Sequence, residues 1–399
     1  MHIDFMSSER SSLGVEVELE VVDQETRELH SGGGDILREM NAEFDGSHPK
    51  AKHELLESTI EIITGICTTV DEARRDLEST LADVTERAEK RGLALMCSGT
   101  HPFSDWKKQQ ITPNERYARL VENMQWLARR MQIFGIHVHV GVRSPDKVIP
   151  IVNALSTYIP QFLALSSSSP YWMGQDTGLA SSRSKVFEGL PTAGLPHQLA
   201  GWTEFEDYMS TLINAETISS VREVWWDVRP HPGFGTVEIR ICDGLPRMSE
   251  IATVAAIGQC LVDRFNTLID RGYKLPVQSN WILRENKWRA ARYGLSASII
   301  LDEKGNTQPL VEAIAELVDE LRPVADKLGC TTELMHALTM IEEGPSYLRQ
   351  RNVVAQGGTL VDVVDSLVEE MRTDKATPLP QRPAYDDMPH RLPADPRVE

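Results

Sequence analysis

The sequence contains 399 residues, of which 41% are hydrophobic, so the chain can bury a full core in one large domain or in two. Its formal net charge of −18 argues against nucleic-acid binding, because that affinity depends on many Lys and Arg contacts to phosphate. The five cysteines are widely spaced and form neither a disulfide framework nor a Cys-x-x-Cys metal motif, which favours a reducing, cytoplasmic location. The N-terminus lacks the basic region and apolar core of a signal peptide, and no apolar run approaches the ~20 residues of a membrane span.

The first third of the chain alternates between predicted strands and predicted helices. Alternating apolar and polar residues predict strands over 13–22, 55–64 and 93–98. Asp71 is placed to cap a helix whose apolar stripe runs from Leu77 to Ala88. Thr112 and Pro113 are placed to open the next helix.

The middle of the chain holds three more predicted strands, over 136–142, 224–229 and 236–242. A helix is expected to start at Ser144 and Pro145 and to be kinked or broken at Pro160. Thr203 with Glu206 has the spacing of a capping box. The stretch 166–196 is dense in Ser, Gly and Pro and is expected to be a functional loop.

The last third of the chain is mostly helical, with predicted helices over 249–271 and 310–328. Residues 374–399 are rich in Pro, Arg and Asp and are expected to form a flexible tail, which leaves 1–373 as a single catalytic domain. Helices and strands alternate without a βαβ rhythm, and the strands alternate apolar with polar residues. This pattern indicates an α+β fold with an antiparallel sheet that is packed on one face.

Three predicted strands share one design. On 13–22, Glu16, Glu18 and Glu20 share a face, with neighbours ~7 Å apart. Such a row fits either the solvated face of an edge strand or a cleft in which a cation neutralises the charges. On 136–142, His137 and His139 share a face, where they could bind a metal or phosphate or simply be hydrogen-bonded.

The third strand of this design, 236–242, places Glu238 and Arg240 on one face, where the simplest interpretation of the pair is a structural ion pair. Three aliphatic faces with charged reverse faces together predict a sheet with a polar face of Glu, His and Arg. Burying so many carboxylates requires cations, and oxygen ligands without a thiolate cluster favour Mg²⁺ or Mn²⁺. On 55–64, Glu57 and Glu61 share a face, so Glu54 can join Glu61 only if the chain bulges or turns between them.

These motifs resemble the type 2 glutamate–cysteine ligase family, also called carboxylate–amine ligases. The resemblance rests on Gly14-Val15-Glu16-Val17-Glu18, Ser98-Gly99-Thr100-His101-Pro102-Phe103, Gly135-Ile136-His137-Val138-His139-Val140-Gly141 and Thr236-Val237-Glu238-Ile239-Arg240. It continues through 176–183, 226–230 and 349–351, and so covers roughly residues 10 to 370 in order. The first, third and fourth motifs are also similar to glutamine synthetase.

The resemblance implies a glutamine synthetase-like catalytic fold, in which a curved antiparallel sheet forms a funnel with helices packed on one face. It also implies roles for individual residues. The metal ligands would be Glu16, Glu18, Glu54, Glu61, His137 and Glu238. His139 would contact phosphate, and Arg240 would bind the transferred phosphoryl group and act in catalysis with Glu61 and Glu238. Arg183 and Arg229 would contact the substrate carboxylates. Near the C-terminus the family usually shows a Gly-Asn-Gly-Ala-like stretch, whereas residues 343–348 of this chain read Glu-Gly-Pro-Ser-Tyr-Leu. The roles of Arg349 and Arg351, which follow this stretch, therefore stay open.

The function that follows is an ATP-dependent carboxylate–amine ligase acting through an acyl phosphate, with glutamate and cysteine as leading substrates and glutathione-type thiol synthesis as its setting. No G-x-x-x-x-G-K-[ST] sequence occurs, so ATP is not held by a P-loop. Three alternatives remain: a metal-dependent amide hydrolase, a ligase acting on a peptide or protein amine, and a non-catalytic nucleotide sensor. The expected partners are small molecules and a second copy in a homodimer, with neither nucleic acid nor membrane.

Overall fold

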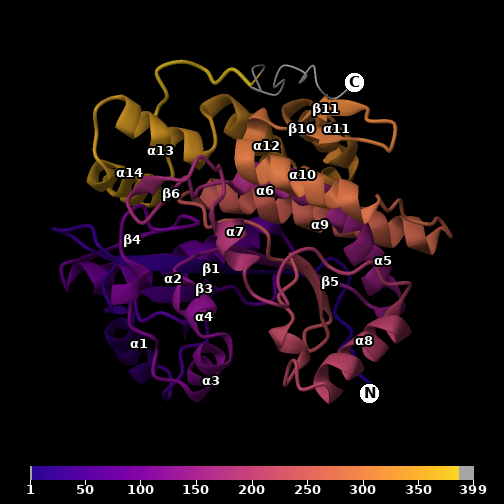
Figure 1. Ribbon diagram of the computed structural model, residues 1–399, viewed down its shortest axis with the longest axis horizontal. Helices are drawn as coiled ribbons and strands as arrows, with labels where there is room; N and C mark the ends of the chain where they lie inside the picture. The colour runs from indigo at the N-terminus through magenta and orange to yellow at the C-terminus, as the bar shows by residue number, and fades with distance from the viewer. Residues whose placement is uncertain (1, 386–399) are drawn as a thin grey trace, which may run out of the picture.

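The computed structural model describes residues 2–385 and is built around one open, seven-stranded antiparallel sheet (Figure 1). The strand order is β2-β3-β1-β5-β9-β8, and β4 also pairs with β1. The strands of this sheet are β1 (Leu13–Asp23), β2 (Ala51–His53), β3 (Thr59–Ile63), β4 (Leu93–Met96), β5 (Ile136–Gly141), β8 (Val228–His231) and β9 (Thr236–Ile239). Two small hairpins lie outside it: β6 (Tyr171–Trp172) with β7 (Gln175–Asp176), and β10 (Ser298–Ile300) with β11 (Thr307–Pro309).

Helices account for most of the rest of the described chain. The α-helices are α1 (Gly33–Ala42), α2 (Val70–Glu89), α3 (Glu115–Met124), α4 (Trp126–Arg129), α5 (Pro145–Leu155), α6 (Ile159–Ser166), α7 (Arg183–Phe187), α8 (Trp202–Asn214), α9 (Met248–Asp270), α10 (Asn280–Tyr293), α11 (Leu310–Leu328), α12 (Thr331–Glu343), α13 (Ser346–Ala355) and α14 (Leu360–Thr373). Short 3₁₀ helices are η1 (Trp106–Lys108), η2 (Ser156–Tyr158), η3 (Val221–Glu223) and η4 (Gly294–Ser296). The C-terminal helices, orange to yellow in Figure 1, gather on one side of the sheet.

The two faces of the sheet follow directly from the alternation in the sequence. Val15, Val17 and Leu19 of β1 are buried in the main hydrophobic cluster, which also contains apolar residues of α2, α5 and α9. Gly258 of α9 lies against the sheet, since a Cβ there would come within 2.9 Å of Ile239 Cδ1. Helix α9 therefore lies directly behind β5 and β9, whose other face carries the polar residues.

The alternation pattern located six of the sheet strands but misplaced some of their ends. The predicted strand 55–64 is wrong in its first half, because the chain turns over 54–58 and pairs with β1 only from Thr59. The predicted strand 224–229 is shifted and pairs only from Val228 to His231. The strand 236–242 ends early at Ile239, because the N–H groups of Arg240 and Ile241 both donate to the Asp227 carbonyl, at 2.8 and 3.1 Å, in a β-bulge.

The predicted helix starts lay within two residues of the observed N-caps, but they named the wrong capping residue. Thr69, not Asp71, caps α2, in a capping box with Glu72. Asn114, rather than Thr112 or Pro113, caps α3. The Thr203–Glu206 capping box is wrong: α8 begins at Trp202, and the Glu206 carboxylate instead accepts a hydrogen bond from the backbone N–H of Ile3 at 2.7 Å.

Proline breaks a long apolar helical stretch as predicted. Helix α5 ends at Leu155, a 3₁₀ turn follows, and Pro160 lies in the first turn of α6. The whole stretch Pro145–Ser166 has the length and mean hydropathy of a membrane span, contrary to the expectation that no such run exists. However, 78% of its apolar window is buried inside the molecule, as in the core helix of a globular protein.

The predicted functional loop 166–196 is more ordered than its composition suggested. It contains the β6–β7 hairpin and α7, and its first four serines, 166–169, are fully buried. The Asp243 carboxylate, after β9, accepts hydrogen bonds from the Ser169 and Ser181 hydroxyls at 2.6 and 2.8 Å. This buried network fixes the segment to the end of β9.

The C-terminal segment returns to the body of the molecule. Asp374 accepts hydrogen bonds from the backbone N–H and the hydroxyl of Ser249, both at 3.0 Å, in the first turn of α9. The Tyr385 hydroxyl donates to the Ile341 carbonyl at 2.8 Å. The rest of the predicted tail lies outside the described residues, so the domain boundary at residue 373 stays a prediction.

Candidate active site

The polar face of the sheet brings the predicted site residues together in rows set by the strand register. Glu18 of β1 is opposite Glu61 of β3, and Glu16 is opposite His137 of β5. His139 is opposite Glu238 of β9. Because these pairs sit at alternate positions on neighbouring strands, all the side chains project from the same face.

Two groups of possible ligand atoms on this face lie close enough together to hold a metal ion. One atom each of Glu16, His137 and Glu238 lie within 4.8 Å of one another, and so do atoms of Glu18, Glu61 and His137. His137 belongs to both groups, and its buried Nε2 atom has no hydrogen-bond partner among the described residues. Carboxylate oxygens with one imidazole suit a divalent cation such as Mg²⁺ or Mn²⁺, so the residues fit the implied metal.

The carboxylates at one end of the face carry more negative charge than the protein neutralises. Burial, followed by the charge of Glu54, raises the pKa of Glu18 to about 7. Burial and then Glu54, Glu16 and Glu18 raise the pKa of Glu61 well above its usual range. Burial also raises the pKa of Glu54. These shifts are what a cation-binding cluster shows when protons alone supply the positive charge.

The histidines and Glu16 behave differently, because they partner each other. The His137 ring contacts the Glu16 carboxylate through Nδ1 at 2.9 Å, and His139 Nε2 lies 3.3 Å from its other oxygen. Burial would raise the pKa of Glu16, but contacts with the two histidines hold it well below its usual range. Burial and then the Arg240 charge lower the pKa of His137 to about 4. Burial acts to lower the pKa of His139, but Glu238 and Glu16 more than offset it and raise that pKa.

The structure places Glu54, rather than Glu57, beside Glu61. The turn over 54–58 brings Glu54 into the cluster. Burial is the largest cause of the raised pKa values of Glu18 and Glu61, and the charge of Glu54 is the second. The Thr112 hydroxyl donates to the Glu54 carbonyl at 2.5 Å and fixes that turn. Glu57 instead faces His53, where its charge opposes the burial that lowers the His53 pKa.

Two arginines clamp Glu238, which is fully buried. Arg229 donates to it through Nε at 2.7 Å and Nη2 at 3.2 Å, and Arg240 pairs with the same carboxylate while lying 3.5 Å from His137 Nδ1. Burial acts to raise the pKa of Glu238, but the charges of Arg229 and Arg240 hold it well below its usual range. Glu238 and Arg240 therefore form the expected ion pair, inside the acidic and histidine cluster.

Arg183 reaches the same region from α7. It donates to the carbonyls of Ile241 and Arg240 at 3.2 and 3.3 Å, and its Nε has no partner among residues 2–385. Gly135 leaves room for it, because a Cβ at that position would collide with the guanidinium. Its charge acts to lower the pKa of Glu18, so it contributes to the field around the cluster.

Arg349 and Arg351, whose roles the sequence left open, lie away from these residues. The Arg349 guanidinium is buried and pairs with Glu250 of α9 at 2.9 Å and with Glu370 of α14 at 2.7 Å. Arg351 pairs with Asp176 of the β6–β7 hairpin at 2.6 Å. Arg349 thus ties α13 to α9 and α14, and Arg351 ties α13 to the β6–β7 hairpin.

Sequence reasoning missed a buried ion cluster behind Arg240. Lys287 of α10 donates to Asp227 at 2.6 Å and contacts Glu188 at 2.5 Å, and the carbonyl of Asp227 accepts the bulge N–H of Arg240. The three ionisable groups lie far apart in the sequence and have no shared motif. The only hint in the sequence was a lysine, Lys287, among the residues of α10 that turn out to be buried, and such a position does not reveal its partners.

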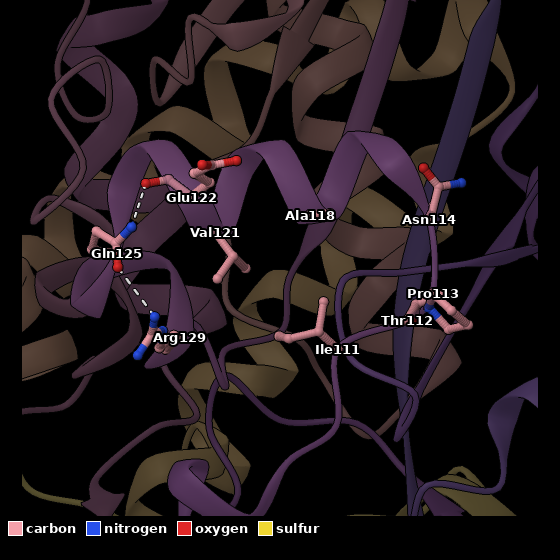
Figure 2. A pocket seen from close by; sticks show the side chains of 9 residues that line it. All are labelled: Ile111, Thr112, Pro113, Asn114, Ala118, Val121, Glu122, Gln125 and Arg129. Carbon is pink, nitrogen blue, oxygen red and sulfur yellow. Dashed lines mark hydrogen bonds between the residues drawn. The ribbon is translucent and has the colours of Figure 1, made fainter.

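A separate pocket of about 500 Å³ lies between α3, α4 and the segment that leads into α3, and Figure 2 shows the side chains around it. Gln125 lines one end of it, donating to the Glu122 carbonyl at 2.6 Å and accepting from Arg129 at 3.1 Å (Figure 2). None of the predicted site residues lines this pocket. Thr112 and Ile111 line the pocket and also hold the Glu54 turn, Thr112 through its hydroxyl and Ile111 through a backbone bridge to Leu56.

The open antiparallel sheet, with carboxylates, histidines and arginines on one face, and the sequence relatives together place this protein in the class of ATP-dependent carboxylate–amine ligases. The chain belongs to glutamate–cysteine ligase family 2, whose profile matches residues 12–366. A Frankia casuarinae protein named "Putative glutamate--cysteine ligase 2-1" is 58% identical over 377 residues, covering 94% of this chain and 99% of the relative. A Thermobifida fusca protein named "Putative glutamate--cysteine ligase 2" is 55% identical over 374 residues, covering 93% and 94%.

Solved structures share the fold at low sequence identity. The glutamate–cysteine ligase of Francisella tularensis, in complex with AMP, aligns with a TM-score of 0.64 at 15% identity and covers 93% of this chain and 90% of that one. A bifunctional glutathione synthetase from Pasteurella multocida aligns with a TM-score of 0.66 at 13% identity, over 91% of this chain and 52% of that one. The predicted ligase fold, with mixed helices and an antiparallel sheet, is therefore confirmed.

Proposed function

We propose that this enzyme joins the carboxylate of glutamate, or of a closely similar acid, to the amino group of cysteine or a similar amine. The observation that supports the proposal is the pair of three-residue ligand groups that share His137, with the Arg240 guanidinium beside them. A cluster of this kind suits the transfer of a phosphoryl group, in which charge neutralisation and alignment do most of the catalytic work.

The reaction proceeds in two chemical steps. The substrate carboxylate oxygen attacks the γ-phosphorus of ATP, the bond to the bridging oxygen breaks, and an acyl phosphate and ADP form. The amine nitrogen then attacks the acyl carbon, the carbon–oxygen bond to phosphate breaks, and an amide and inorganic phosphate are released with loss of the amine proton. The first step converts a poor electrophile into a good one.

The residues divide this work among them. Glu16, Glu18, Glu54, Glu61, His137 and Glu238 would hold Mg²⁺ or Mn²⁺, and bound cations would neutralise the phosphate oxygens and polarise the transferred group. Arg240 would contact the transferred phosphoryl group and His139 a phosphate oxygen, while Glu61 and Glu238 would act with Arg240 as the catalytic groups. Arg183 and Arg229 are the candidates for the substrate carboxylate; Arg183 fits better, because every guanidinium nitrogen of Arg229 already donates within the protein.

The proposal includes several broader features of the enzyme. We expect the sheet to curve into a funnel around the polar face, the protein to act in the cytoplasm, and two copies to form a homodimer. Light scattering after gel filtration tests the dimer. An amide hydrolase and a ligase for a protein amine are less well supported, because the relatives that match nearly their whole length carry glutamate–cysteine ligase names.

An oxygen-transfer experiment tests the function directly. Glutamate labelled with ¹⁸O in its side-chain carboxylate is incubated with ATP, Mg²⁺, cysteine and the enzyme, and the released phosphate is analysed by mass spectrometry. The acyl-phosphate route moves one ¹⁸O atom into phosphate for each amide formed. A panel of other acids and amines identifies better substrates, and phosphate release without label, or amide cleavage that needs no ATP, would contradict the proposal.

A further inference from the structure

An aromatic cluster lies at the far end of the polar face, in the β8–β9 hairpin. The Phe234 ring stacks on the His231 ring, with centroids 4.1 Å apart and planes at 18°. His139 meets both rings edge-on, at 5.3 Å from His231 and 5.6 Å from Phe234. Phe234 nevertheless remains 55% exposed, so one large aromatic surface beside His139 faces solvent.

The hairpin turn that carries Phe234 is held rigidly. The N–H of Phe234 donates to the His231 carbonyl at 3.1 Å, and the N–H of Gly235 donates to the Pro232 carbonyl at 3.2 Å. Gly235 has a φ of 64°, a left-handed conformation that favours glycine, and its missing side chain admits the backbone of Met6. A surface fixed in this way loses little conformational entropy when a ligand stacks on it.

The cluster follows the proposed phosphate site along the strands. His139 is in the same row as Glu238, and the next row, two residues on, pairs Thr236 with His231. The Thr236 hydroxyl is hydrogen-bonded to His139 Nδ1 at 3.0 Å. Rows are ~7 Å apart, so His231 lies about two rows, or ~14 Å, from the row of Glu16 and His137. The face thus runs from carboxylates, through histidine and arginine, to an aromatic surface.

We propose that Phe234, supported by His231, is the stacking surface for the purine base of ATP. The inference rests on the proposed function, which places the nucleotide phosphates at His139 and Arg240. The order of groups along the face matches the order within a nucleoside triphosphate, from charged phosphates to a flat aromatic base. Aromatic side chains bind bases of any identity through their π faces, so Phe234 strengthens nucleotide binding without reading the exocyclic groups.

The test compares a ligand that has a base with one that lacks it. Loss of one stacking contact typically weakens binding by about ten- to a hundredfold. We expect Phe234→Ala to raise the dissociation constant of MgATP by that factor and to leave the inhibition constant of magnesium tripolyphosphate unchanged. Phe234→Trp should retain the affinity for ATP. Circular dichroism and the melting temperature establish that each variant is folded.

Phe44→Ala is the matched control. Phe44 follows α1, is 45% exposed and has its ring centroid 4.5 Å from that of His48. The Phe44→Ala substitution therefore removes a similarly exposed ring beside a histidine at another place in the molecule. This control should bind both ligands as the wild type does. Equal weakening of ATP and tripolyphosphate by Phe234→Ala, or weakening of neither, would overturn the inference while leaving the ligase function standing. Wild-type protein that binds neither ligand would contradict the proposed function itself.

Discussion

Among single residues, Arg240 divides its guanidinium between Glu238 and the space beside His137. If it only pairs with Glu238, Lys can replace it at little cost. If it meets the phosphoryl group, the loss of its planar, two-pronged donor should lower kcat by on the order of 10²–10³, with a smaller change in the KM for ATP. Steady-state kinetics on Arg240→Lys measure this. Arg351→Lys, at the separate pair with Asp176, is the control, and a near-normal kcat in folded Arg240→Lys would return Arg240 to a structural role.

His101 gives the stability of the fold a predictable pH dependence. Its Nε2–H donates to the Arg27 carbonyl at 2.8 Å and its Nδ1 accepts the Ser104 N–H at 3.0 Å, so the ring is held neutral. Burial lowers its pKa to about 3, and the unfolded chain therefore takes up a proton first as the pH falls below 6.5. Its contribution is complete above pH 6.5 and declines by about 1.4 kcal/mol per pH unit down to about pH 3.

The measurement for His101 is chemical unfolding of the wild type and of His101→Gln at pH 7 and pH 5. Gln preserves polar contacts but does not titrate. The wild type should lose about 2 kcal/mol more than the variant over this interval. Equal losses would show that His101 becomes protonated inside the native protein.

At the scale of elements, Lys287 joins α10 to the start of β8 through Asp227. Lys287→Met should leave a buried carboxylate without its cation and lower the free energy of unfolding by about 3–5 kcal/mol. Asp227→Asn combined with Lys287→Met removes both charges and should recover much of that loss. Urea unfolding of the two variants and of wild type completes the comparison, and a double variant no more stable than Lys287→Met would mean that the two charges are not coupled.

The ends of elements also show where the sequence was informative. The period of two predicted β1, β5 and β9 and the face of each strand that carries Glu16, His137 or Glu238, because side chains alternate along a strand; the common design of the three strands predicted that these faces meet. It could not place Glu54, whose position depends on a turn held by Thr112 from a distant segment. The helix caps were misassigned by one or two residues, because Thr, Asp and Asn offer similar oxygens and only the backbone geometry selects one.

For the whole molecule, we expect cation binding at the acidic cluster to be coupled to the release of protons from its carboxylates. The chain carries a net charge of −18, and burial raises the pKa values of Glu18, Glu54 and Glu61. Mg²⁺ or Mn²⁺ that binds only the folded state should raise the melting temperature by an amount that grows with the logarithm of its concentration. Scanning calorimetry of wild type, with and without EDTA, measures this shift.

The cation prediction has a matched variant. Glu18→Gln should be more stable than the wild type in EDTA, because like-charge repulsion falls, and should lose most of the cation-dependent rise. Full turnover in excess EDTA would show that the reaction needs no cation, and an equal rise in both proteins would show that Glu18 does not bind the cation.

The sequence positions of the sheet strands set the order in which this site can form. The central strand β1 is synthesised first, yet it pairs with β3, β4 and β5, and the clamp on Glu238 requires Arg229 and Arg240 much later in the chain. On the ribosome, Glu16 and Glu18 therefore leave the exit tunnel well before their partners exist. Their mutual repulsion disfavours pairing between two unfinished chains, so we expect the acidic row also to lower the tendency of the nascent protein to aggregate.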